Sequence, residues 1–227
     1  MNYPNEKEAR ELICELGRRL YEKDMVAAND GNLTAKIAPD RILATPTGVS
    51  KGFMTPEMMS VLDLDGNVID AGTIKVSSEV KMHLRIFNEN PDVGACVHAH
   101  PVNATCFATA GIPLDAPIVT ETIPAVGIVP VAEFGIPGSQ EVPDSVAPFA
   151  KEYNACLMSF HGVLTWGDDL TQALYRMECV EHYAMMTLRL RYIMRSDRFM
   201  NEEQVAACVK IREDMGELRG GVPEGRW

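Results

Sequence analysis

The sequence predicts a mixed α/β fold in one domain, with a central sheet and helices on both of its faces. Two observations carry this prediction. Segments with helical spacing of apolar residues alternate along the chain with short runs typical of strands. No repeat, low-complexity tract or linker-like stretch divides the 227 residues, a length that suits one hydrophobic core. We therefore expect one domain over 1–227, with a helical tail from about residue 200.

The first half of the chain predicts two helices separated by paired strands. The opening helix has apolar residues at helical spacing, and Asn5 followed by Glu8 resembles a capping box. Pro39-Asp40 and Asp65-Gly66 are typical of turns between paired strands. The predicted elements are a helix over 5–23, strands over 33–37 and 41–45, a hairpin over 61–69, and a helix from Ser77 to the breaker Pro91.

The second half adds further strands and a long helix. Residues 94–100 (GACVHAH) alternate like a strand, and the following helix is expected to end at Gly111. Residues 111–138 carry five prolines, which excludes a membrane-spanning helix and predicts short strands and loops. The remaining predicted elements are a helix over 142–153, strands over 155–160 and 161–167, a long helix over 169–194 and a helix over 201–215.

Composition excludes several classes of function. The chain has 21 Lys and Arg against 32 Asp and Glu, a net charge of −11. This charge provides no general attraction for nucleic acid or an anionic membrane. The six cysteines are widely spaced without a C-x-x-C pair, which favours reduced thiols over a disulfide scaffold. The start of the chain lacks the apolar stretch of a secretory signal. We expect a cytoplasmic protein with neither a nucleic-acid nor a membrane partner.

The sharpest local motif is VHAH, because residues two apart on a strand face the same side and His98 and His100 thus present two imidazoles together. His161 follows a second apolar strand, where its ring can meet the other two. Three histidines with one exchangeable position are typical of a catalytic zinc site. A bare H-x-H also suits the solvent face of a strand. Cys96, on the same face, is either a further soft ligand or a small buried residue, and the remaining histidines, His83 and His182, suit packing or surface roles.

Three separated segments offer hydrogen-bond donors to an anion. Taken singly, each also suits an ordinary turn or a helix cap. Glu79 is either a charge at a helix N-terminus or a general acid/base, and the second role would require burial to raise its pKa. The segments are Gly31-Asn32, Thr47-Gly48 and Ser77-Ser78.

Taken in order, the motifs GNLT, TPTG, SSE, HAH and HG resemble the class II aldolase/adducin superfamily over about residues 6–195, and its fuculose phosphate aldolase branch most. The resemblance implies a mostly antiparallel sheet and a cytoplasmic homotetramer with sites at subunit interfaces. It further implies retro-aldol cleavage of a ketose 1-phosphate to dihydroxyacetone phosphate and a small aldehyde. L-fuculose 1-phosphate, or a related deoxy or pentulose phosphate, is the implied substrate.

The same resemblance implies a role for each site residue. His98, His100 and His161 would bind one zinc ion per subunit, and Glu79 would be the acid/base, itself able to reach the metal in the resting enzyme. The implied phosphate ligands are Gly31, Asn32, Thr47, Gly48, Ser77 and Ser78.

Two positions depart from the fuculose branch, which places tyrosines into the neighbouring subunit's site. Thr120 and Met215 stand at the aligned positions here, so the residue acting on the C4 hydroxyl of the substrate is left open. Glu121 beside Thr120 is a possible substitute.

Three other branches of the superfamily are alternatives. Ribulose-phosphate 4-epimerase typically carries aspartate where Glu79 stands, so the SSE triplet favours an aldolase. Methylthioribulose-1-phosphate dehydratase also uses three histidines and a glutamate, and the motifs do not exclude it. The adducin-like branch consists of interaction proteins that have lost the metal site, whereas all three histidines are present here.

Overall fold

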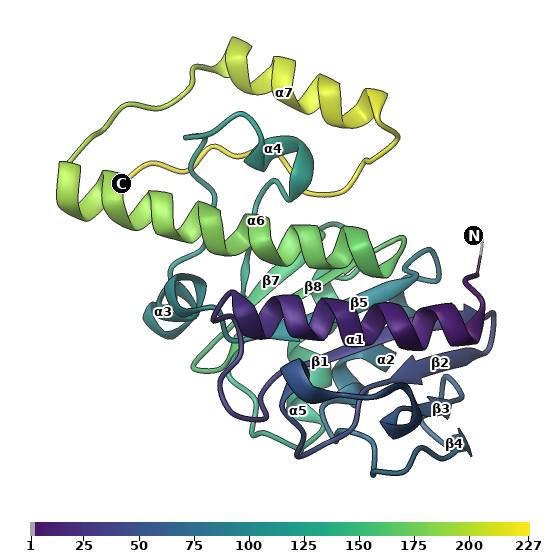
Figure 1. Ribbon diagram of the computed structural model, residues 1–227. Helices are drawn as coiled ribbons and strands as arrows, with labels where there is room; N and C mark the ends of the chain where they lie inside the picture. Colours follow the sequence, from purple (N-terminus) through teal and green to yellow (C-terminus); the bar gives the residue numbers. More distant parts are fainter. Residues whose placement is uncertain (1–2) are drawn as a thin grey trace.

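An eight-stranded sheet forms the middle of the computed structural model, which describes residues 3–227 (Figure 1). Its order is β4-β3-β2-β1-β5-β8-β7-β6, and every neighbouring pair is antiparallel except β6 with β7. The strands are β1 Asn32–Ala38, β2 Arg41–Ala44, β3 Ser60–Leu62, β4 Val68–Asp70, β5 Ala95–Ala99, β6 Val131–Ala132, β7 Ala155–Met158 and β8 Gly162–Gly167. The predicted fold class, with its mostly antiparallel sheet, is confirmed.

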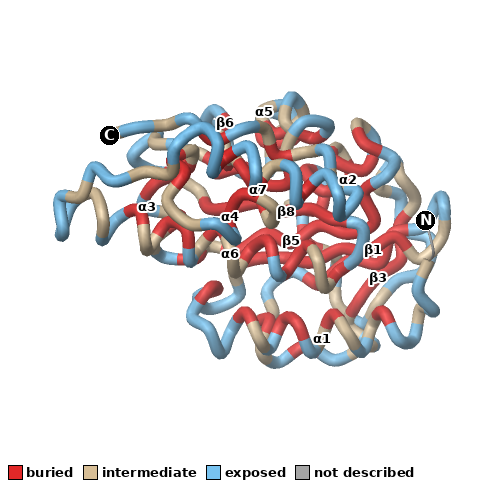
Figure 2. The backbone as a smooth tube through the Cα atoms, turned by 90° about the horizontal axis from the view of Figure 1, so that it is seen from above, coloured by how far each residue is buried: buried red, intermediate tan, exposed pale blue. Residues whose placement is uncertain are grey.

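Helices cover both faces of the sheet. One core cluster joins α1, α3 and α6 to one face, and a second joins α2 and α5 to the other (Figures 1 and 2). The α-helices are α1 Glu6–Glu22, α2 Val80–Glu89, α3 Val102–Ala110, α4 Thr122–Ala125, α5 Glu141–Val146, α6 Leu170–Leu188 and α7 Glu202–Asp214. Short 3₁₀ turns are η1 Lys51–Phe53, η2 Pro56–Met58 and η3 Ala147–Phe149, and a π-helical turn, η4 Arg189–Met194, continues α6.

Strand β5 shows how the alternation of side chains separates these two cores. Ala95, Val97 and Ala99 pack into the cluster of α1 and α6, whereas Cys96 packs into the cluster of α2. His98 therefore points to the α2 side, because residues two apart share a face. Cys96 is fully buried and lies outside the group of possible metal ligands, so it is a small core residue.

Several element boundaries differ from the prediction. The helix expected over 142–153 ends at Val146 and gives way to a 3₁₀ turn, since Pro148 cannot continue an α-helix. The helix expected from Ser77 begins at Val80, while Ser77 instead accepts a hydrogen bond from the Glu79 amide at 3.4 Å. In the stretch predicted as strands and loops, Thr122–Ala125 form α4. Pro124 is tolerated there because the amides of a first helical turn have no acceptor within the helix, so the missing N–H costs no hydrogen bond.

The C-terminal segment packs back onto the domain. Asn201 caps helix α7 and forms a capping box with Gln204, and the helix meets α4 in a small apolar cluster (Figure 1). Beyond it, Glu217 accepts a hydrogen bond from the buried Arg176 of α6 at 2.5 Å. No helix within residues 3–227 is long and apolar enough to cross a membrane.

Candidate metal centre and anion cavity

His98 and His100 are placed by the pairing of β5 in the middle of the sheet. His98 lies opposite Asn32 of β1 and Leu164 of β8, so a ladder of hydrogen bonds holds it from both sides. Its ring is fully buried, and Nδ1 lies 2.8 Å from the Val163 carbonyl oxygen. His100 follows directly after the strand, on the same side as the period of two predicts.

His161 reaches the same point from the tight turn between β7 and β8. Phe160 takes a left-handed backbone conformation (φ 56°) that is uncommon for a residue other than glycine, and its neighbour His161 thereby turns back toward β5. Gly162 leaves room for this approach. A Cβ there would lie 2.6 Å from both the Ala99 carbonyl oxygen and Cδ2 of His100.

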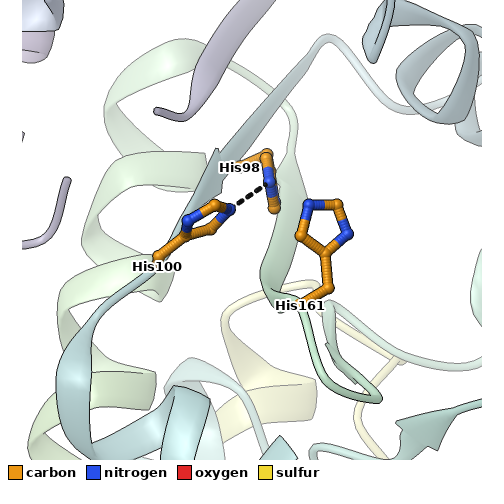
Figure 3. Close-up of side chains that lie close together, drawn as sticks. All are labelled: His98, His100 and His161. Atoms are coloured by element: carbon orange, nitrogen blue, oxygen red, sulfur yellow. Dashed lines mark hydrogen bonds between the residues drawn. The ribbon is translucent and has the colours of Figure 1, made fainter. Parts of the chain in front are cut away.

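The three imidazoles converge in space, as Figure 3 shows. One ring nitrogen from each lies within 4.8 Å of the others, and the ring centroids are 4.8–5.2 Å apart. Nε2 of His100 lies 3.0 Å from Nε2 of His98. The structure thus brings together all three predicted metal ligands.

The proton positions on these rings suit a bound metal ion. Because a carbonyl oxygen only accepts, neutral His98 carries its proton on Nδ1 and leaves the lone pair of Nε2 free. Nδ1 of His100 faces the Asp30 carboxylate at 3.3 Å, which favours the same tautomer. Two nitrogen lone pairs then face each other, an arrangement that a cation between them stabilises. Burial lowers the pKa of His98 and His100, which keeps both neutral and able to ligate.

Glu79 lies against the histidine cluster, at the N-cap of α2. Its Oε1 is 3.1 Å from Nε2 of His161, and its Oε2 is 3.9 Å from Nε2 of His98. Asn32 donates from Nδ2 to Oε2 at 2.6 Å. Burial by itself raises the pKa of Glu79, but the His161 hydrogen bond and the nearby histidines outweigh it and lower the pKa. The sequence argument left two roles open for Glu79 and required a raised pKa for the acid/base role; the structure instead favours the ionised carboxylate, the form of a base.

A cavity of about 290 Å³ opens beside this cluster, and three chain segments meet around it. An isolated antiparallel bridge joins Pro46 to Val76, and the Ser77 amide donates to the Thr45 carbonyl at 3.2 Å. The Thr45 hydroxyl accepts from the Leu33 amide at 3.1 Å, which ties the start of β1 to the same point. A few hydrogen bonds between loops therefore assemble the cavity.

Most of the residues predicted to bind phosphate line this cavity. Two do not: the side chain of Asn32 donates to Glu79, and Gly48 lies in the exposed turn next to Thr47. Gly31 has φ 77°, and a Cβ there would lie 2.8 Å from the His98 carbonyl oxygen, so only glycine fits against β5. The lining residues are Asn29, Asp30, Gly31, Pro46, Thr47, Lys51, Ser77, Ser78, Glu79, His100, Pro137 and Gly138.

Larger surface hollows of about 600 and 710 Å³ lie elsewhere, beside the start of α1 and along α7, and no histidine lines either of them. Among the lining residues that the sequence argument did not assign to the site, two are charged. Asp30 precedes the GNLT motif and faces His100, and Lys51 is a lone lysine whose burial no local pattern announces.

The other residues considered from sequence lie apart from the cavity. Thr120 and Glu121 are exposed and hydrogen-bond to each other at 2.7 Å, and Met215 is exposed at the end of α7. His83 is buried beside Thr34 at 2.8 Å, and His182 is exposed on α6. None of these five residues lines the cavity of the single chain.

Three convergent imidazoles beside a carboxylate and a polar cavity have the composition of an enzyme site. Residues 11–188 match the family described as Class II Aldolase and Adducin N-terminal domain. The chain therefore belongs to this family and is an enzyme of the class II aldolase type, as the motifs predicted. Aldolases of this class depend on a metal ion, and the histidine cluster could hold one.

Relatives with three different activities resemble the chain to a similar degree. A 3-oxo-tetronate 4-phosphate decarboxylase of Haemophilus influenzae is 33% identical over 80% of this chain and 88% of its own length. An L-fuculose phosphate aldolase of Methanococcus maripaludis is 32% identical over 80% and 93%. A methylthioribulose-1-phosphate dehydratase of Acidiphilium cryptum is 29% identical over 76% and 86%.

Solved structures agree with this assignment. The crystal structure of YgbL from Klebsiella pneumoniae, described as a putative aldolase/epimerase/decarboxylase, superposes with a TM-score of 0.84 at 28% identity, covering 90% of this chain and 99% of that one. An L-fuculose 1-phosphate aldolase gives a TM-score of 0.82 at 26% identity, covering 91% of this chain and 96% of that one. The specific reaction within the family is thus open among several related ones.

Proposed function

We propose that the protein is a metal-dependent aldehyde-lyase that cleaves a ketose 1-phosphate to dihydroxyacetone phosphate and a small aldehyde. One observation carries the proposal: the three histidines and Glu79 converge beside a cavity lined by Gly31, Thr47 and the two serines. In this reaction the C3–C4 bond breaks and the C4 hydroxyl loses its proton as the aldehyde forms. The electron pair left on C3 then takes up a proton, which completes dihydroxyacetone phosphate.

Glu79 is the group proposed to handle the proton at C3. Its carboxylate is held by Asn32 and His161, so its position against the histidines is set before substrate arrives. In its ionised form it removes the C3 proton in the condensation direction, and in cleavage the same carboxyl returns that proton.

The metal assignment rests on the chemistry of the donor set. Three neutral imidazoles are the ligands of many catalytic zinc sites, so His98, His100 and His161 would hold one zinc ion per chain. When bound, the ion supplies a Lewis acid that stabilises negative charge beside the substrate ketone.

The phosphate of the substrate is proposed to bind in the adjoining cavity. Ser77, Ser78 and Thr47 line it with hydroxyls, and the chain at Gly31 approaches closely because no side chain stands there. Binding energy from the phosphate, remote from the breaking bond, then fixes the reacting carbons.

We extend the proposal to a homotetramer in the cytoplasm, with sites at subunit interfaces. The π-helical turn η4, which continues α6, exposes large apolar side chains, Ile193 at 71% and Met194 at 69%, which an interface would cover. The six cysteines are all free, as expected of reduced thiols. Light scattering on the purified protein tests the assembly, and a monomer in solution would contradict it.

A second candidate is decarboxylation of a 3-oxo-tetronate 4-phosphate, the activity named for a relative 33% identical. Loss of carbon dioxide from this β-oxo acid leaves the same carbanion, and protonation again yields dihydroxyacetone phosphate. One observation favours it: Thr120 and Met215 stand where the fuculose branch has tyrosines, and neither side chain offers a phenol to exchange a proton with a C4 hydroxyl. Decarboxylation needs no such residue.

A substrate panel separates the candidates. The purified protein, loaded with zinc, is assayed with L-fuculose 1-phosphate, ribulose 1-phosphate, 5-deoxyribulose 1-phosphate and 3-oxo-tetronate 4-phosphate. Dihydroxyacetone phosphate is detected through coupled NADH oxidation. We expect metal-dependent release from a ketose 1-phosphate. Release from the oxo acid alone assigns the decarboxylase, and release from none of the four overturns both. Turnover of methylthioribulose 1-phosphate or ribulose 5-phosphate would instead assign a dehydratase or an epimerase.

Glu79→Gln tests the proton-transfer role separately. The variant keeps the shape of the side chain, so we expect normal zinc content, whereas deuterium exchange at C3 of dihydroxyacetone phosphate should fall about 100- to 10,000-fold. Glu22→Gln, at an exposed position of α1, is the control. Exchange at the normal rate in Glu79→Gln would remove its assigned role.

A further inference from the structure

Lys51 is a buried cation at the start of η1, shortly after the TPTG turn in the sequence. Only 1% of its surface is exposed. Its ammonium donates to the Val49 carbonyl at 2.7 Å and to the Asn29 carbonyl at 2.9 Å. Val49 follows Gly48, and Asn29 lies two residues before Gly31, so one ammonium joins the two loops that bring backbone to the cavity.

The charges around the cavity favour such a cation. Asp30 and Glu79 contribute two carboxylates to the lining, and Lys51 is the one lysine or arginine among the lining residues. A phosphate monoester is close to a dianion at neutral pH, so it would enter against both carboxylates unless a positive charge compensates them.

The ammonium also has unused capacity. Lysine carries three N–H donors, and within residues 3–227 two of those on Lys51 have a protein acceptor. Burial lowers the pKa of Lys51 to about 8, although Glu79 and Asp30 are near enough to raise it. An anion in the cavity would use the third donor and favour the charged form.

Lys36 shows what a buried lysine with a purely structural role looks like in the same chain. It is 5% exposed on β1, and it donates to the Pro91 carbonyl at 2.8 Å. Its ammonium also lies 5.2 Å from the centre of the Phe87 ring, which stabilises the charge locally. Lys36 lies outside the cavity lining. The two lysines are therefore both buried and both donate to carbonyl oxygens, but only Lys51 lines the cavity.

We propose that Lys51 recognises the phosphate of the substrate, binding it through the ammonium while bridging the Asn29 and Val49 loops. The proposal rests on the proposed function, which supplies the phosphorylated substrate. It adds the compensating charge that hydroxyls and amides cannot provide.

The test compares Lys51→Met with Lys36→Met, because both remove a buried lysine that donates to a carbonyl. Each protein is loaded with zinc and titrated calorimetrically with inorganic phosphate and with dihydroxyacetone phosphate. We expect Lys51→Met to lower the affinity for both ligands by about 10- to 100-fold, the equivalent of one lost hydrogen bond to a charged group. Lys36→Met should leave both affinities unchanged. With the turned-over substrate, KM should rise by a similar factor while kcat changes less.

Equal phosphate affinity in the wild type and Lys51→Met overturns the inference, as does an equal loss in both variants. Lys51→Arg and Lys51→Gln carry the test if Lys51→Met does not fold: the charged variant should bind phosphate within about tenfold of the wild type and the neutral one should not. The inference fails if Lys51→Gln binds as well as Lys51→Arg. Because phosphate binding needs no turnover, Lys51-dependent binding by a protein inactive on the substrate panel would refute the proposed function alone.

Discussion

The histidine cluster and the anion cavity adjoin each other, yet different kinds of structure hold them. His98 lies on a central strand that is hydrogen-bonded on both sides, and His100 follows it directly. The cavity is instead assembled from loops that meet through one isolated bridge and a few single hydrogen bonds. Because loop contacts open at lower free energy than a central ladder, we expect the cavity to loosen before the cluster does.

The two regions also differ in charge. In the cluster, burial lowers the pKa of His98 and His100 and keeps both neutral, and a negative charge comes from the carboxylate of Glu79. The cavity contains the buried ammonium of Lys51, whose pKa burial lowers to about 8. Metal binding and phosphate binding should therefore respond separately to substitutions, and the four predictions below use that separation.

The largest effect is expected from His98→Ala, which removes a ligand from the rigid region. Zinc content should fall from about one ion per chain to near zero, and turnover by at least about 1,000-fold, because several kcal/mol of charge stabilisation are lost. Elemental analysis measures the metal. His182→Ala, at an exposed position of α6, is the matched control. Undiminished zinc in His98→Ala would rule out the ligand set.

Gly162→Ala should disturb the cluster without removing a ligand. The added Cβ would lie 2.6 Å from Cδ2 of His100, so that ring must move. We expect zinc affinity, measured by chelator competition, to fall about 10- to 100-fold, as for other changes next to metal ligands. Gly216→Ala strains a backbone at φ 84° with no atom within 4 Å, so it should cost stability and leave zinc affinity intact. Equal zinc affinity in both variants would contradict the close packing.

Thr45→Val should loosen the cavity while sparing the cluster. Its hydroxyl accepts from the buried Leu33 amide, and losing that acceptor should lower the free energy of unfolding by about 1–3 kcal/mol. Phosphate affinity should fall about 3- to 10-fold. The loss is small because Thr45 positions the loops and does not itself line the cavity, so every group that contacts phosphate is still present. Zinc content, measured on the same sample, should stay normal. A parallel loss of zinc would show that the two regions are not independent.

The smallest effect concerns the pH dependence of stability. Lys51 has a pKa of about 8 in the folded protein against 10.5 for an ordinary lysine. Between these values the unfolded chain binds more protons, so the Lys51 contribution to stability rises with pH. From pH 7.5 to 10 the wild type should gain about 1–3 kcal/mol relative to Lys51→Met, measured by urea unfolding without phosphate. Glu79 and Asp30, which face Lys51, are present in both proteins. If the difference in unfolding free energy between the two proteins stayed constant with pH, burial would not lower the pKa of Lys51.

Local patterns were sufficient where one element decides the outcome. The period of two in β5 predicts that His98 and His100 share a face, and Asn5 caps the helix Glu6–Glu22 as predicted. Its side chain accepts from the Lys7 amide, however, and does not form the expected capping box with Glu8. Pro148, which ends the helix near Val146, was also visible in the sequence, and the expected helix over 142–153 ignored it. The short α4 was missed because four residues carry no measurable periodicity.

The sequence by itself determined the class of fold, the family and the residue types of a metal-binding enzyme site, since these depend on periodicity and on motifs within single segments. Only the tertiary structure decided that Asn32 holds Glu79 and that Lys51 faces the anion cavity. It also lowers the pKa of Glu79, whereas the acid/base role considered from sequence required a raised one. The physical reason is that burial and electrostatic potential are sums over residues distant in the chain, and no local pattern records them.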